Sequence, residues 1–417
     1  LPIYLPFVST KNDRMRPREV FDPRDDFLKR IFVEEDVFPV GKYAQPTALV
    51  VLEYLGMKGK GEITGQKVYE SAKAVNNILD VSAAETKSLT IMSFLTSNPT
   101  KLEEIVSGTS GLGELGIHLK NMPWVSVIRR KPDDYPENLP FWGETHTEPY
   151  FLKPSDVKYK QAANIIGSTK ALVKAEPSSQ LTRFFSWNAD PAASDVVQHL
   201  QNVIRAYSPQ EKPRYIIIAQ EIYAFLSCAH HDEVLAALEN VKNLPWIWNG
   251  DGFSSPRFLI SQKPPIDLSP YIFSLPSEMG RFYGLFAKFG LQEKCNEAFL
   301  LEVLHLIKEK YDDHPPPPTA EVRKDLQLCV DILNEIKPNV GDQLPPELQE
   351  KVLIPTHVED DAYVKLAPVE RCMYCEHEWL ERSNHDGEED EEIEYSYVHP
   401  NIPNSTEIGR ASCRERV

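Results

Sequence analysis

The chain has 417 residues, of which 41% are hydrophobic and 10% aromatic, and this composition excludes a wholly disordered protein. Its formal net charge of −17 argues against a nucleic-acid-binding protein, because neutralising phosphates requires clustered Lys and Arg. No apolar stretch approaches the ~20 residues of a membrane-spanning helix, so we predict no membrane insertion.

The cysteines and the two ends of the sequence suggest where the chain works and that it is a piece of a longer protein. Six irregularly spaced cysteines and no signal-peptide pattern indicate a reducing compartment, and we expect a cytoplasmic protein. The chain opens at Leu1 in an apolar run without an initiator Met. We interpret residues 408–417 as a translated sequencing adapter and exclude them from the fold prediction.

The length exceeds that of one ordinary domain, and the 34 scattered prolines favour many short elements. We therefore predict a mixed, helix-rich α/β fold of several modules, in which short strands and hairpins pack with helices. The predicted chain ends in a helical unit and an acidic loop.

Residues 1–150 form the first predicted module, which is rich in helices. Asp22-Pro23 is typical of a helix start, since Asp accepts early backbone N–H bonds and Pro suits the first turn. A second helix is expected over 47–55, ending at Gly56. Alternating residues near 123–128 predict a short strand.

The second predicted module, 151–270, is mixed α/β and contains a hairpin over 246–260. Its strands are expected at Trp246–Trp248 and Pro256–Ile260, joined by Asn249-Gly-Asp-Gly252, because these turn residues accept positive φ angles. Apolar spacing predicts two helices before the hairpin, around 190–207 and 234–241.

The third predicted module, 271–371, is helical. Two apolar faces predict two helices, which the four prolines Pro315–Pro318 separate as a stiff connection, with Thr319 as the second N-cap. The last segment, 372–407, contains Cys372-Met-Tyr-Cys375 and the acidic run Gly387–Glu394, which we expect to be a solvated loop.

Cys372 and Cys375 have the C-x-x-C spacing that can place two thiolates on one zinc ion, with histidines following nearby. A second close pair of ligands is missing, so free or packed thiols are the alternative and we assign no metal-binding residue. The candidate histidines are His377, His385 and His399.

No other motif indicates catalysis or a cofactor. Gly111-Leu-Gly113-Glu-Leu-Gly116 matches the dinucleotide fingerprint by letter, but no strand precedes it and Pro123 interrupts the helix that should follow. The adjacent His230 and His231 lack the i, i+4 spacing of metal ligands. We therefore predict that the chain is not an enzyme and has no catalytic residue and no cofactor.

Several ordered phrases carry a family resemblance that covers Leu1 to about Thr406. They include Phe21-Asp-Pro, Trp246-Ile-Trp-Asn-Gly-Asp-Gly-Phe253, Pro270-Tyr271 with Leu275-Pro276, and Tyr397-Val-His399-Pro. In these residues the chain resembles the sacsin family, large proteins of repeated regions that each open with an ATPase-like domain.

The resemblance implies a part of one repeat downstream of that ATPase-like domain. It implies a co-chaperone role with the heat-shock protein 70 system, client proteins as partners, and association with mitochondria and intermediate filaments. The leading hypothesis is thus a non-catalytic scaffold and interaction segment. The alternatives are a zinc-dependent adaptor organised by Cys372 and Cys375, and an enzyme whose carboxylates converge in a cleft that sequence does not reveal.

Overall fold

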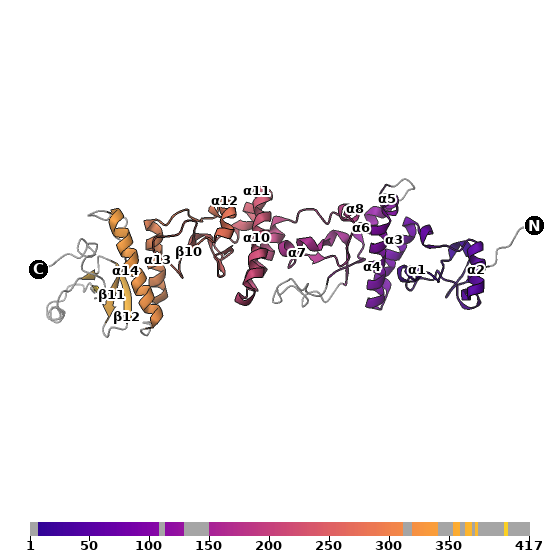
Figure 1. Ribbon diagram of the computed structural model, residues 1–417, viewed down its shortest axis with the longest axis horizontal. Helices are drawn as coiled ribbons and strands as arrows, with labels where there is room; N and C mark the ends of the chain where they lie inside the picture. Colours follow the sequence, from indigo (N-terminus) through magenta and orange to yellow (C-terminus); the bar gives the residue numbers. More distant parts are fainter. Residues whose placement is uncertain are drawn as a thin grey trace, which may run out of the picture. The chain divides into compact units, whose positions relative to one another are not determined.

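The computed structural model confirms a helix-rich mixed fold whose strands are short (Figure 1). The chain divides into two compact units, Leu1–Val241 and Lys242–Val417. The described residues are 7–107, 113–128, 150–311, 319–340, 353–358, 363–368, 372–373 and 396–398. The predicted proline connection and acidic loop lie outside them, and the predicted module boundaries stay predictions.

A small cluster of elements opens the first unit. Strands β1 (Val8–Ser9) and β2 (Arg14–Met15) pair antiparallel, and helix α2 (Pro46–Tyr54) packs with them around a cluster of five buried side chains. The cluster consists of Val8, Val20, Leu49, Leu52 and Met57. Helix α2 ends as predicted, because Gly56 follows it with a φ of +94° that suits glycine.

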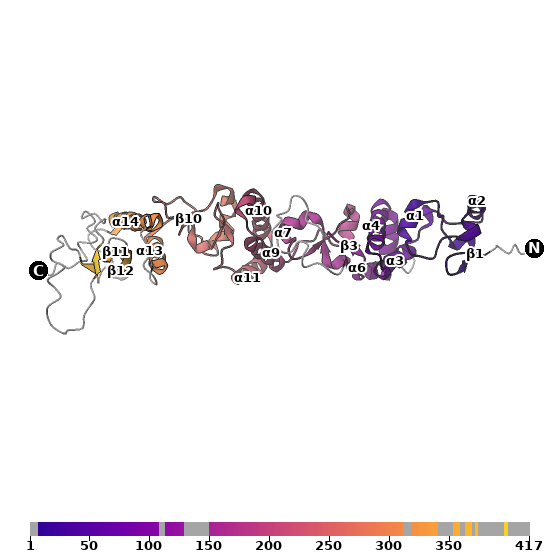
Figure 2. The ribbon, with the colours of Figure 1, turned by 90° about the horizontal axis from the view of Figure 1, so that it is seen from below.

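The main core of the first unit lies between five helices, with α3 and α4 side by side (Figure 2), and buried side chains of residues 124–187. The five helices are α1 (Asp26–Ile31), α3 (Gly65–Ala74), α4 (Val81–Ser97), α5 (Pro99–Ser107) and α6 (Gly113–Asn121).

The predicted start of the first helix was wrong by one turn. Asp25 caps α1 and accepts from the Phe27 N–H at 2.8 Å. Asp22 instead accepts from both the backbone N–H and the side chain of Arg24, in the turn before α1.

The rest of the first unit adds the predicted strand near 123–128 and two predicted helices. Strand β3 (Val125–Ser126) pairs antiparallel with β4 (Phe151–Leu152), and β5 (Val157–Lys158) pairs parallel with β6 (Ala171–Leu172). The helices are α7 (Ala163–Ile166), α8 (Ser179–Phe184), α9 (Ala193–Arg205), α10 (Lys212–Cys228) and α11 (His231–Glu239). Helix α9 falls within the predicted range 190–207, whereas α11 overlaps the predicted range 234–241 but begins three residues earlier.

The predicted hairpin opens the second unit, but its second strand was placed too late. Strand β7 (Ile247–Trp248) pairs antiparallel with β8 (Phe253–Ser254), and Asn249 Oδ1 accepts from the Asp251 and Gly252 N–H groups in the turn. Pro256 starts a short 3₁₀ helix, since it has no N–H for a ladder. The next strand, β9 (Leu259–Ile260), pairs parallel with β10 (Phe273–Ser274).

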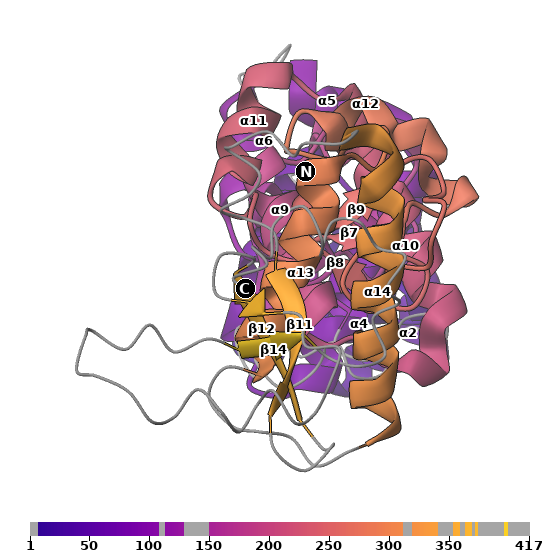
Figure 3. The same cartoon turned by 90° about the vertical axis from the view of Figure 1, so that its left-hand side faces the viewer.

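Helices α12 (Tyr283–Ala287), α13 (Glu297–Tyr311) and α14 (Ala320–Val340) follow, and α13 and α14 bury the two predicted apolar faces. A four-stranded sheet contacts α13 (Figure 3). Its order is β12 (Tyr363–Pro368), β11 (Leu353–Val358), β14 (Ser396–Val398), β13 (Cys372–Met373). The sequence interpretation assigned 353–368 to a helical module and missed these strands.

Candidate functional site

The zinc hypothesis concerns residues that lie mostly outside the described part of the chain. The backbone of Cys372 belongs to β13, whereas Cys375 and the candidate histidines are not described. Among the described residues, no three His, Cys, Asp or Glu side chains are placed to hold a metal ion. Zinc binding by Cys372 and Cys375 therefore stays an untested alternative to free or packed thiols.

Two other motifs from the sequence analysis lie, at least in part, within the described residues. Gly113 and Gly116 of the glycine run lie in α6 rather than in a loop after a strand, so the dinucleotide fingerprint is not formed there. Trp246 and Trp248 of the predicted hairpin are 1% and 0% exposed, so both side chains belong to the core.

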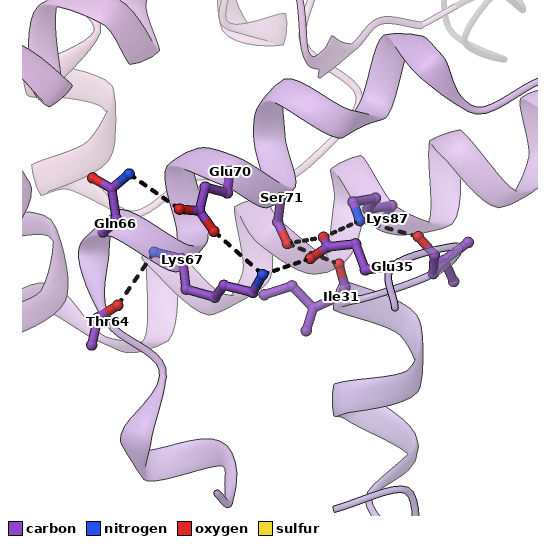
Figure 4. A network of polar contacts seen from close by, with 9 residues as sticks. Ile31, Glu35, Thr64, Gln66, Lys67, Glu70, Ser71 and Lys87 are labelled. Atoms are coloured by element: carbon purple, nitrogen blue, oxygen red, sulfur yellow. Dashed lines mark hydrogen bonds and ion pairs between the residues drawn. The ribbon is translucent and has the colours of Figure 1, made fainter. Parts of the chain in front are cut away.

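A buried ionic network in the first unit joins three elements that are far apart in the sequence (Figure 4). Lys87 of α4, whose side chain is 0% exposed, donates to Glu35 Oε1 at 2.5 Å and to the Val33 carbonyl at 3.2 Å. Ser71 of α3 also donates to Glu35, and Lys67 Nζ lies 3.1 Å from the second Glu35 oxygen. Glu35 therefore connects the loop after α1 to both α3 and α4.

The electrostatics of this network favour a structural role. Burial lowers the pKa of Lys87, and the carboxylate of Glu35 opposes this shift. The Lys87 amine is inaccessible, so it has no approach for a substrate. The pair instead satisfies charges that would be costly to bury alone.

A second network in the second unit centres on Asp325 of α14. This carboxylate accepts from Tyr271 Oη at 2.9 Å, from Lys310 Nζ at 2.7 Å and from Tyr311 Oη. Burial raises the pKa of Tyr311 to about 12, and Asp325 adds to this shift. The hydroxyl groups of Tyr271 and Tyr311 are therefore protonated at neutral pH and donate to Asp325. These bonds connect α14 to α13 and to the loop between β9 and β10.

His199 of α9 forms a third buried cluster, in the first unit. Its Nδ1 accepts from the Ser168 N–H at 3.1 Å and contacts Ser168 Oγ at 2.5 Å, and its Nε2 lies 3.1 Å from the Asn164 carbonyl. Because Nδ1 accepts a backbone N–H, the proton must reside on Nε2. Burial lowers the pKa of His199 to about 4, so this Ser–His pair is a neutral connection within the core.

A shallow cleft of about 390 Å³ lies at the start of α13 and is lined by Cys295, Glu297 and Glu335 among others. Burial raises the pKa of the Cys295 thiol, and the Glu335 charge adds to the shift. The thiol is thus protonated at neutral pH, which is the unreactive form.

Helix α2 exposes apolar side chains on the face opposite its buried one. Leu49 and Leu52 point into the cluster beneath, whereas Val50, Val51 and Tyr54 are 47%, 56% and 89% exposed. We call these last three residues the α2 surface. The sequence analysis predicted this helix but not its exposed apolar face. The signal it missed is the run 48–52, in which every residue is apolar.

The described residues thus define a helix-rich segment whose buried ionisable groups hold elements together and whose second helix offers an apolar surface. A comparison of this sequence with those of known proteins finds a distant relative. The chain is distantly similar to a region of human sacsin, with 25% identity over 388 residues. The match covers 89% of this chain and 8% of sacsin.

No protein-family model matches the chain, and no solved structure matches it either. Within the described ranges, no helix is both long enough and apolar enough to span a membrane.

Proposed function

We propose that the chain is a non-catalytic scaffold and interaction segment of a sacsin-like co-chaperone. It would act in the cytosol beside the heat-shock protein 70 system and bind unfolded client proteins. The observation that carries this proposal is the similarity to sacsin, which extends over 388 residues rather than over one motif.

The chemistry of the described side chains supports the same role. Lys87, His199 and Asp325 are buried and engaged in contacts between elements. The thiols of Cys295 and Cys329 have pKa values raised by burial, which disfavours nucleophilic chemistry. The α2 surface offers the apolar area that client binding requires.

Light scattering of heated citrate synthase tests the proposal. The chain should suppress aggregation of this client, whereas the same mass of serum albumin should not. Unchanged scattering at a several-fold molar excess of the chain would refute client binding.

The C-x-x-C spacing keeps a zinc-dependent adaptor as the second candidate. Metal analysis of the purified chain distinguishes the two. The adaptor requires about one zinc per chain, lost in the Cys372→Ser variant, and zinc-free protein of unchanged fold would eliminate it.

A further inference from the structure

We propose that the α2 surface is a docking site for an acidic peptide segment that carries apolar side chains. This inference rests on the proposed function and names the chemical class of the partner. It comes from two independent features, the apolar character of both faces of α2 and the positive charge around its ends.

The first feature is that α2 is apolar on both faces. Leu49 and Leu52 are each 4% exposed, while Val51 and Tyr54 on the other side are 56% and 89% exposed. Thr47 and Glu53 are the only residues of α2 that are neither apolar nor aromatic, and a helix with so few polar residues is normally buried on most sides. Tyr is also enriched among the residues that dominate binding energy at interfaces. The outward face of α2 therefore has the composition of an interface.

The second feature is a set of four cations around α2, on a chain whose net charge is −17. Lys42 precedes the helix by four positions, and Lys58 and Lys60 follow its end. The Arg18 side chain lies over Gly56, just beyond the last turn, because a Cβ built on Gly56 would be 3.0 Å from Arg18 Cγ.

Aromatic rings, rather than carboxylates, hold three of these cations. The Nζ atoms lie 5.1 Å from the Tyr43 ring for Lys42, 5.7 Å from Phe21 for Lys58 and 4.2 Å from Phe27 for Lys60. In the described part of the chain, none of the four forms an ion pair; the nearby Glu53 pairs with Arg24 instead. These positive charges remain available to a partner.

The charge pattern favours an acidic peptide over an anionic membrane. The segments that form the cluster around α2, residues 7–24 and 41–62, carry eight Lys and Arg against five Asp and Glu. A short peptide docked there meets this net positive charge, because charges beyond the screening length of about 8 Å contribute little. A membrane extends far beyond that range and would face the whole chain, whose charge of −17 repels it. Helix α2 itself also carries no Lys or Arg, whereas helices that lie in a membrane interface are rich in these residues on their polar face.

Fluorescence anisotropy tests the proposal with the intact chain. The probe is a labelled peptide of about 16 residues with Leu and Phe at helical spacing and Glu elsewhere. The chain should bind it, and Tyr54→Ser should weaken binding at least tenfold, because Tyr54 supplies the largest exposed apolar side chain of the surface. The Lys42→Glu/Lys60→Glu variant should weaken binding about fivefold at low salt and less at high salt.

Matched controls separate the site from nonspecific effects. Leu79→Ser replaces an apolar residue that is 97% exposed in the turn before α4, and Lys324→Glu reverses an exposed cation on α14; both should bind within about twofold of the unaltered chain. A probe with Gln in place of Glu should bind more weakly. All four variants change exposed side chains, so circular dichroism should report an unchanged fold.

Three results would overturn the docking site. They are no binding of the acidic probe, equal binding by the unaltered chain and Tyr54→Ser, and binding to phosphatidylserine vesicles without binding to the probe. If the probe fails while the chain still suppresses client aggregation, only this site is refuted and the proposed function stands.

Discussion

Glu35 is the residue on which three elements of the first unit depend. It follows Glu34, whose φ of +59° is unusual for a side-chain-bearing residue, and it receives donors from α3 and α4. Removing one partner of a buried ion pair is costly because the other charge stays buried without compensation.

We expect Glu35→Gln to lower the free energy of unfolding by about 3 kcal/mol, since Lys87 would keep its burial and lose its carboxylate. Urea denaturation measures the change. Glu70→Gln, at a half-exposed partner of Lys67, is the matched control and should lower it by less than about 1 kcal/mol.

The double variant Glu35→Gln/Lys87→Met distinguishes an ion pair from two independent contacts. Removal of both charges should recover a large part of the stability lost in Glu35→Gln. Strictly additive losses would contradict the interpretation of Figure 4 as a coupled network.

The burial of His199 should make the free energy of unfolding depend on pH. Burial lowers its pKa to about 4, below the ordinary value of 6.5, so the unfolded chain binds the proton more tightly. The contribution of neutral His199 to the free energy of unfolding is fully present above pH 6.5. It is lost as the pH falls toward 4, by about 3 kcal/mol in total.

The measurement is urea denaturation at several pH values, compared between the unaltered chain and His199→Gln. A Gln side chain has both a donor and an acceptor but does not titrate. The variant should therefore show a shallower loss of stability between pH 6.5 and 4, and identical slopes would contradict the assignment.

At the scale of elements, the sequence predicted correctly those turns and helix ends that are determined by neighbouring residues. The Asn249-Gly turn, the helix over 47–55 and its Gly56 end are determined by residues a few positions apart, and the sequence located them correctly. The networks of Glu35 and Lys87 were missed because their partners are 52 positions apart and only packing brings them together.

The errors also have local causes. Strand β11 contains Pro355, and a proline within an apolar run argues against a strand. Asp22 and Asp25 both suit an N-cap by residue type, and residue type alone does not show which of them meets the first N–H groups of the helix.

The cap assignment gives a prediction for α1. Asp25→Ala should lower the free energy of unfolding by about 1 kcal/mol, because the Phe27 N–H loses its acceptor. Thermal unfolding of the variant measures the loss. Lys29→Ala, in the same helix and exposed, should leave the midpoint unchanged; a larger loss for Lys29→Ala than for Asp25→Ala would contradict the cap assignment.

At the scale of the whole molecule, the sequence predicted the mixed, helix-rich fold class and the similarity to sacsin. It did not predict the α2 surface, because apolar spacing identifies a face that can be buried and does not show that a second face stays exposed. That surface and the internal use of the buried ionisable groups support the proposed role in binding proteins.

The amount of chain needed to protect a client tests this role most directly. Citrate synthase aggregation should be measured over a titration of the chain, with and without ATP. A scaffold should act only near equimolar amounts and equally well without nucleotide. Full protection at a small fraction of the client concentration, or only with ATP, would contradict the proposal and indicate turnover.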